Sequence, residues 1–204
     1  MTIRKGEQWG TRISKPSRIR HVSSDAEIAQ CSSEDYISVG GGDIFTTLGS
    51  PAFISDSDEC TLLPMDALQV KILLSDASEK SFKAASCIEV GSLMSPLKSG
   101  RYICVTNGGI VSGRNFAPRA HPNDGRLDIM LVAETMSFRD RLTARKKALT
   151  GTHVPHPSIS LRQDETFSTK RLGERDTLRI DGITAANWLE VSVSIVPDYW
   201  QIVV

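Results

Sequence analysis

The chain has 204 residues, 40% hydrophobic and 24% charged, a composition that predicts one globular domain with a core, or one domain with a small appendage. Lysine and arginine together number 24, and so do aspartate and glutamate, so a net charge of zero gives no general attraction to nucleic acid. Because no apolar run approaches a membrane span and the first ten residues lack a signal peptide's apolar core, we expect a cytoplasmic protein without a transmembrane segment.

Residues 1–64 predict a hairpin followed by a reduced α/β unit. Alternating side chains around a glycine-containing turn at residues 2–13 predict the hairpin. Residues 18–22 predict a short strand. Ser24, with Glu27 three positions later, has the capping-box pattern that begins a short helix.

A glycine-rich turn follows the predicted strand at residues 36–39. Gly41, Gly42 and Asp43 lead from this strand into a helix, and such a turn can hold phosphate on its free backbone amides. No lysine follows, so the segment is not a P-loop. Two interpretations stay open, which are a remnant of a phosphate loop and a tight turn that requires small residues.

Residues 65–204 alternate in the manner of many short strands, with Asp181-Gly182 predicting a hairpin turn and Pro197-Asp198 another turn. We therefore predict a mainly β (α+β) protein, in which a two-layer β-sandwich at 65–204 packs against the N-terminal unit.

One late helix is predicted at residues 138–149 and ends near Gly151. Its apolar residues, at positions 138, 142 and 149, lie opposite a basic face. Because Asp140 and Thr143 interrupt the apolar face, we interpret it as a solvated helix rather than a membrane-binding one.

The loop at residues 107–128 separates two predicted strands, and loops of this length usually carry function. Arg114 and Arg119 flank its Gly/Pro-rich part, and paired guanidinium groups bind phosphate or carboxylate. We predict a site for a small anion or a lipid head group at Asn107, Arg114, Arg119 and His153. The other interpretation of His153 is that of a structural residue in a rigid, proline-rich loop.

Asp124 and Asp128, in the same loop, are oxygen donors suited to Mg²⁺ or Ca²⁺ together with a loop carbonyl and waters. Alternatively, Asp124 is the hydrogen-bonding residue of an Asp-Gly turn. A structural Mg²⁺ is thus the candidate cofactor. The sequence has no G-x-S-x-G elbow and no credibly spaced Ser/His/Asp set.

Several of these motifs resemble the second domain of the diacylglycerol kinase family, which includes bacterial lipid kinases and sphingosine kinases. They are N-G-G at 107–109, A-P-R-A at 117–120 and N-D-G-R-L-D at 123–128, and their order and spacing agree over roughly residues 65–204. The resemblance implies a two-layer β-sandwich that covers a nucleotide-binding domain and helps to form a lipid site.

Two positions depart from the family pattern. Residues 41–46 resemble the family's GGDGT loop, but Ile44 replaces a glycine, and its side chain would crowd a backbone that must approach phosphate. The family's Asp-Gly-Glu turn reads Asp181-Gly182-Ile183, and isoleucine cannot act as a base. Residues 1–64 also look too few for a complete nucleotide domain. We therefore predict no catalytic residues.

Three functional hypotheses follow. In the first, the chain is a kinase-family protein without kinase activity that binds a small anionic or lipid-like ligand, or acts as an interaction or regulatory module. In the second, it is a reduced lipid or nucleotide kinase that transfers phosphate from ATP with a site completed by another subunit. In the third, it is a structural partner of a separate nucleotide domain. Because exposed strands favour self-association, we expect a homodimer.

Overall fold

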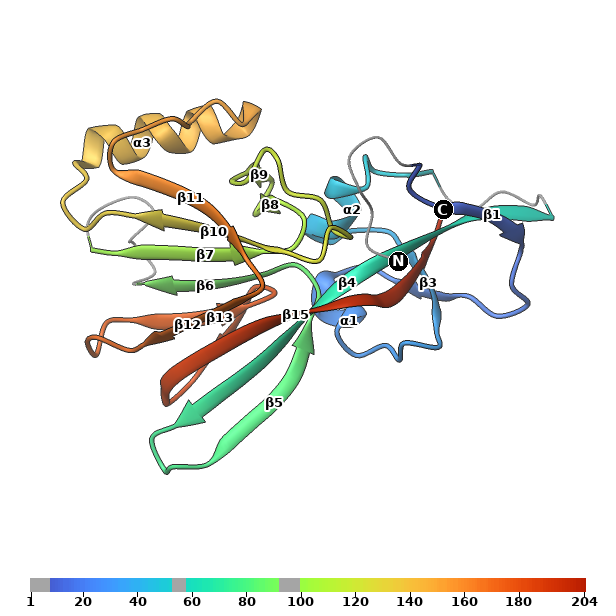
Figure 1. Ribbon diagram of the computed structural model, residues 1–204, viewed down its shortest axis with the longest axis horizontal. Helices are drawn as coiled ribbons and strands as arrows, with labels where there is room; N and C mark the ends of the chain where they lie inside the picture. The colour runs from blue at the N-terminus through green and yellow to red at the C-terminus, as the bar shows by residue number, and fades with distance from the viewer. Residues whose placement is uncertain (1–7, 53–57, 92–99) are drawn as a thin grey trace.

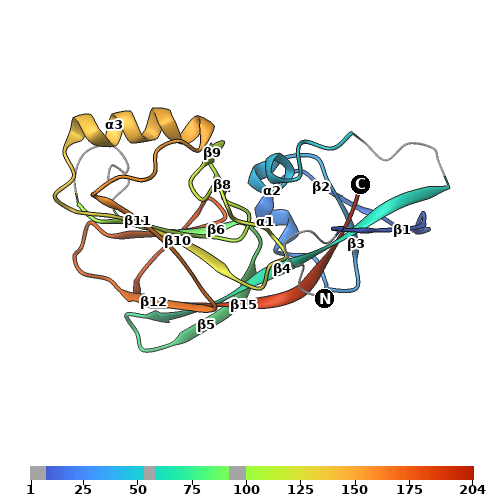
Figure 2. The same ribbon diagram turned by 45° about the horizontal axis from the view of Figure 1, so that its top comes forward.

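The computed structural model describes residues 8–52, 58–91 and 100–204. Two stacked sheets form a β-sandwich, which confirms the predicted fold class (Figures 1 and 2). The seven-stranded sheet has the order β1-β4-β15-β3-β2, with β5 beside β4 and β12 beside β15, and the six-stranded sheet has the order β11-β10-β7-β6-β13-β14.

The strands of the larger sheet are β1 (Thr11–Ser14), β2 (Arg20–Val22), β3 (Tyr36–Val39), β4 (Glu59–Leu74), β5 (Glu79–Ala84), β12 (Thr166–Lys170) and β15 (Trp188–Val203). Those of the smaller sheet are β6 (Cys87–Gly91), β7 (Tyr102–Thr106), β10 (Leu127–Val132), β11 (Ile159–Asp164), β13 (Thr177–Ile180) and β14 (Ile183–Ala185). A separate hairpin consists of β8 (Ile110–Val111) and β9 (Arg114–Asn115). The helices are α1 (Asp25–Ile28), α2 (Gly42–Thr47), α3 (Phe138–Lys147) and the 3₁₀ turn η1 (Ala148–Thr150).

Strands β4 and β15 join the two halves of the molecule. Each is 16 residues long, and they pair antiparallel along most of their length. One end of the pair lies in the sandwich beside β5 and β12, and the other lies beside β1 and β3 in the half that holds the C-terminus (Figure 1). The predicted boundary between residues 64 and 65 thus falls inside β4, and the division into two domains stays a prediction.

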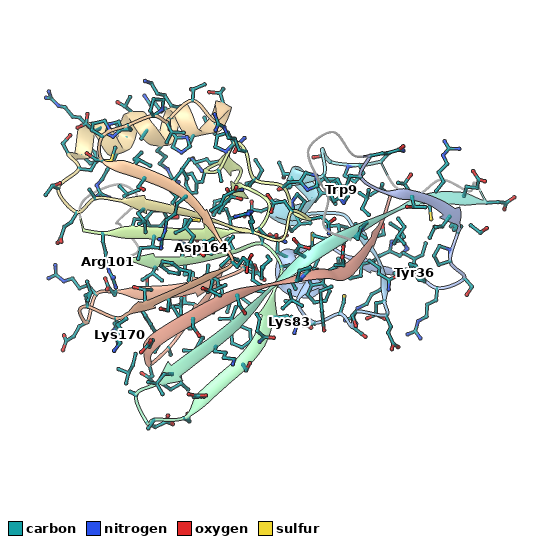
Figure 3. The ribbon with its side chains drawn as sticks, viewed as in Figure 1. Trp9, Tyr36, Lys83, Arg101, Asp164 and Lys170 are labelled. Atoms are coloured by element: carbon teal, nitrogen blue, oxygen red, sulfur yellow. The ribbon has the colours of Figure 1, made fainter. Side chains whose placement is uncertain are left out.

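The predicted turn at Pro197-Asp198 is wrong, because β15 continues through it. The register against β4 shifts between Val196 and Trp200, and Asp198 has a φ of 54°. Proline has no amide hydrogen for the sheet, and a bulge takes up such a residue without ending the strand. Lys83 lies beside this bulge, with its ammonium 4.5 Å from the ring centre of Tyr199 (Figure 3).

The predicted capping box at Ser24 and Glu27 is confirmed. The Ser24 side chain accepts a hydrogen bond from the amide of Glu27, and the Glu27 carboxylate accepts one from the amide of Ser23 at 2.8 Å. The first arm of the predicted N-terminal hairpin lies outside the described residues, and its expected second arm overlaps β1, which pairs with β4.

Three clusters of buried residues form the interior. The first fills the space between the two sheets and includes Leu68, Leu127 and Trp188. The second lies in the N-terminal half and includes Ile37, Ile44 and Trp200. The third lies on the outer face of the six-stranded sheet, where Figure 2 shows α3 lying over that sheet.

Helix α3 packs with an unusual face inward. Its buried residues include Arg141, whose guanidinium donates to the carbonyls of Met136 at 3.0 Å and of Gly100 and Ala133 at 2.7 Å. The large apolar side chains point outward, in contrast to the usual packing of an amphipathic helix. We ascribe this orientation to Arg141, because it provides the donors that these carbonyls require.

Candidate functional site

A carboxylate of the chain itself caps the start of α2. Asp25 accepts hydrogen bonds from the backbone amides of Asp43 at 2.8 Å and Ile44 at 3.0 Å. A β-carbon added at Gly42 would lie 2.5 Å from an oxygen of Asp25, and one at Gly41 would lie 2.5 Å from the carbonyl oxygen of Ser23. Close packing therefore accounts for both glycines, and the amides of Asp43 and Ile44 at the start of α2 already donate to a carboxylate.

Burial raises the pKa of Asp25 to about 6, even though the hydrogen bonds from Asp43 and Ile44 favour its charged form. Near neutral pH the carboxyl is therefore mostly ionised, with its charge placed where an anion at a helix start is stabilised.

Asp43 joins α2 to the β8–β9 hairpin. Its carboxylate accepts from the amides of Ser112 at 2.8 Å and Gly113 at 3.2 Å. The Thr47 hydroxyl donates to the carbonyl of Gly108 at 3.3 Å. The segment predicted as a phosphate-loop remnant thus serves here as a junction with the loop after β7.

The Asp-Gly turn between β13 and β14 contains a second internal anion. The Asp181 carboxylate accepts from the amides of Ala85, Ser86 and Cys87 at 2.8, 2.9 and 3.0 Å. Its pKa is raised because it is buried. Ile183, which stands where the resemblance has a glutamate, is 62% exposed and carries no proton acceptor.

Asp66 of β4 holds the loop after β7 and is not among the residues predicted from the sequence. Its fully buried carboxylate accepts from the amide of Gly125 at 2.7 Å, the amide of Asp198 at 2.9 Å and the side chain of Asn123 at 3.1 Å. The side-chain amide of Asn107 donates to the Asp66 carbonyl at 2.7 Å. The one available signal was an aspartate within an apolar strand segment.

Trp9 adds a further contact to this loop (Figure 3). Its indole donates to the carbonyl of Pro64 at 2.9 Å, and its ring lies edge-on to His121, with 4.6 Å between ring centres. The loop is thus fixed both to β4 and to the N-terminal half.

A groove of about 770 Å³ opens on the other side of this loop. Its apolar lining includes Pro118, Val154 and Leu161. Its polar lining consists of Arg119, Asp128, His156, Arg162 and Gln163. Arg119 is exposed and makes no hydrogen bond or ion pair with another described residue. Nδ1 of His156 accepts from the amide of Ser158 at 3.1 Å, which leaves the hydrogen on Nε2.

The structure separates the four residues predicted to bind an anion. Arg119 lines the groove, whereas Arg114 turns back to donate to the carbonyl of Ser112 at 2.9 Å. Asn107 is buried at Asp66. His153 is 3% exposed, lies edge-on to Phe116 beside a cavity of about 30 Å³ under α3, and has a pKa lowered by burial.

Comparison with known proteins assigns the fold to a family. The model of the YegS C-terminal NAD kinase beta sandwich-like domain matches residues 77–204, more than half of the chain. The chain belongs to this family. No curated protein sequence matches it.

Two solved structures agree with the family at the level of the fold. A provisionally assigned diacylglycerol kinase from Bacillus anthracis str. Sterne gives a TM-score of 0.60 at 12% identity, over 88% of this chain and 75% of that one. A second structure with the same description, from the same strain, gives 0.51 at 13% identity with the same coverage. Yeast NADH kinase complexed with NADH gives 0.47 at 10% identity, over 87% of this chain and 57% of that one.

The groove lies within the family's NAD kinase beta sandwich-like domain, as do Asp124 and Asp128. By contrast, Asp25, Asp43 and Asp66 precede the matched residues. The chain therefore has a fold like that of diacylglycerol and NAD kinases, with the groove formed by the family domain.

The structure brings Asp124 and Asp128 close together. The side-chain amide of Gln163 donates to Asp124 at 3.3 Å and to Asp128 at 3.4 Å. Burial, and to a lesser degree the charge of Asp124, raise the pKa of Asp128 to about 7. Asp124 also accepts from the amide of Arg126 at 3.0 Å, as expected for an Asp-Gly turn.

This donor set is compatible with a hard cation. Two carboxylates, with the Gln163 oxygen after rotation of its amide, supply three oxygen ligands, and Mg²⁺ usually keeps several waters. Among the described residues, no group of three or more His, Cys, Asp or Glu side chains is arranged to hold a metal ion.

Proposed function

We propose that this chain is a ligand-binding member of its family rather than a phosphotransferase, and that it binds a small amphipathic anion. The observation that carries this proposal is the Asp25 carboxylate on the amides of Asp43 and Ile44. A nucleotide phosphate would have to displace this carboxylate and would be repelled by it. Phosphoryl transfer needs a phosphate cradle, a metal ion and a positioned nucleophile together. Ile183 supplies no base at the Asp-Gly turn.

The groove supports binding of an anion with an apolar part. Arg119 and His156 present N–H donors to it, and Arg119 is free of partners among the described residues. A phosphate or carboxylate bound by a guanidinium gains charge-assisted, frequently bidentate hydrogen bonds. The apolar wall of Val154, Pro155 and Leu161 suits a hydrocarbon portion of the same ligand.

Calorimetric titration with dioctanoyl phosphatidic acid, inorganic phosphate and ATP tests this proposal. We expect the lipid phosphate to bind, inorganic phosphate to bind more weakly, and ATP not to bind. Arg119→Gln combined with His156→Gln is expected to weaken the binding of the lipid phosphate at least about tenfold, because two hydrogen-bond donors to one anion are lost. Arg114→Gln is the matched control and is expected to leave the affinity unchanged.

Equal loss of affinity in Arg114→Gln would contradict the assignment of the groove. Incubation with labelled ATP, Mg²⁺ and a diacylglycerol provides the second measurement. Transfer of label to the lipid would overturn the proposal in favour of a reduced lipid kinase whose site is completed by another subunit.

We further propose a structural Mg²⁺ at Asp124 and Asp128. The ion would relieve the repulsion between two desolvated carboxylates, so millimolar MgCl₂ is expected to raise the melting temperature by roughly 2–5 °C. Asp128→Asn is expected to remove this response, whereas the exposed Asp140→Asn is expected to keep it. If NaCl at the same ionic strength raises the melting temperature equally, the effect is simple screening of charge and not binding of Mg²⁺.

Among the described residues, no helix has the length and apolar character needed to cross a membrane. The homodimer and the cytoplasmic location stay predictions. Self-association would be favoured by the sheet edges at β5, β11 and β14.

A further inference from the structure

The outward surface of α3 carries a cluster of exposed apolar side chains, which we call the α3 patch. It consists of Phe138 and Leu142 of α3 and Leu149 of the 3₁₀ turn η1 that continues it, whose exposed fractions are 54%, 38% and 61%. Spacings of four and seven residues place them on one side of a helix. Single exposed apolar residues are ordinary on a protein surface, but a contiguous group of large ones usually marks a binding surface.

Basic residues adjoin the α3 patch. Arg139, Lys146 and Lys147 are exposed on the same helix. At 100° per residue, Arg139 and Lys146 lie within about a quarter turn of the apolar stripe, on the side away from the sheet. Residues 138–149 contain five basic side chains and one acidic side chain. Arg141 is buried and Arg145 is half-buried, so Arg139, Lys146 and Lys147 are the basic side chains exposed to solvent.

The patch faces away from the rest of the molecule. Arg141, Ala144 and Ala148 form the buried side of the helix and its 3₁₀ extension. Figure 2 shows α3 on the outer face of the six-stranded sheet, with the seven-stranded sheet on the opposite side. A flat surface could therefore approach the helix along its length.

From the sequence we interpreted this helix as solvated, but its large apolar side chains are exposed instead of packed on the sheet. We therefore propose that the α3 patch binds the surface of an anionic lipid membrane, with its apolar side chains in the interfacial region and its basic side chains at the head groups. Charge complementarity favours a membrane over a protein partner. Lysine is depleted in protein–protein interfaces, whereas basic residues beside an apolar stripe are typical of helices that lie in a membrane surface.

This inference goes beyond the proposed function and does not require it. Leu149 lies two residues before Gly151, which lines the groove, so membrane-bound α3 would hold the groove near the lipid surface. Loss of membrane binding and loss of ligand binding are separately measurable.

Flotation with lipid vesicles tests the proposal. The full chain is mixed with phosphatidylcholine vesicles that contain about 30% phosphatidylserine, and with vesicles of phosphatidylcholine alone. We expect binding to the anionic vesicles, and binding at least about tenfold weaker to the neutral ones or in raised salt. Phe138→Ser with Leu142→Ser, and Arg139→Glu with Lys146→Glu, are each expected to weaken vesicle binding at least about tenfold.

Leu172→Ser is the matched control, because Leu172 is 74% exposed but lies far along the chain, between β12 and β13. It is expected to bind vesicles as the wild type does, and circular dichroism of each variant checks that the fold is retained. The proposal is overturned if the wild type does not float, if neutral vesicles bind it equally, or if Leu172→Ser has the same defect. It is also overturned if the wild type fails to float but self-associates through the patch, as shown by a dimer that Phe138→Ser with Leu142→Ser abolishes.

Discussion

Replacing Asp66 by alanine is expected to lower the free energy of unfolding by about 3 kcal/mol and the melting temperature by roughly 6–12 °C. The Asp66 carboxylate is fully buried and accepts hydrogen bonds from Gly125, Asp198 and Asn123. Alanine leaves the two backbone amides without this acceptor, and a buried donor without a partner costs about 1–3 kcal/mol. The lost bonds join three separate parts of the chain, so the loop after β7 should loosen together with the bulge in β15.

Thermal unfolding followed by circular dichroism measures this effect, and hydrogen exchange at Gly125 and Asp198 locates it. Asp76→Ala is the control, since Asp76 is exposed in the turn between β4 and β5, where it accepts from Ser78. We expect little change in its melting temperature. A shift below about 2 °C in Asp66→Ala would mean that water replaces the carboxylate at little cost, and that Asp66 does not hold the loop.

Local signals predicted the elements well, and long-range pairing decided the exceptions. The Ser24–Glu27 cap depends on residues three apart, so its pattern is visible in sequence. Pro197-Asp198 looks like a turn because both residues favour turns, but whether the chain bends there depends on β4, more than 120 residues earlier. The helix at 138–147 was likewise predicted, but its buried face is set by carbonyls of Gly100, Ala133 and Met136.

The site was harder to predict because its contacts join distant segments. The sequence indicates that small residues are needed at Gly41 and Gly42. It does not indicate that the amide of Asp43 donates to the carboxylate of Asp25, which lies 18 residues earlier. Arg114 and Arg119 are five residues apart, yet one folds back on the β8–β9 hairpin and the other lines the groove. Residue type suggested an anion site, whereas only the path of the chain shows which arginine is available for it.

Replacing Asp25 by asparagine is expected to destabilise the protein by an amount that depends on pH. An asparagine retains one acceptor oxygen, but its nitrogen would face the amide of Asp43 or Ile44, which now donates to a carboxylate oxygen. A protonated carboxyl, by contrast, can turn its hydrogen away and keep both oxygens as acceptors. We therefore expect the free energy of unfolding to fall by about 1 kcal/mol at pH 7.5 and by about 3 kcal/mol at pH 4.5.

The sign of this dependence follows from the folded pKa of about 6, which lies above the unfolded value of 3.8. The folded protein binds this proton more tightly, so Asp25 contributes most to stability at low pH, and the contribution falls as pH rises from about 4 to about 6. Between pH 4.5 and 7.5 the wild type should lose about 2 kcal/mol of unfolding free energy that the asparagine variant does not lose.

Urea unfolding of both proteins across this range measures the difference. The exposed Glu34→Gln removes a charge from the same half and should give a curve parallel to that of the wild type. A constant difference between wild type and Asp25→Asn at all pH values would show that the carboxyl at the start of α2 is not desolvated, and the amides there would then be accessible to a solvent anion.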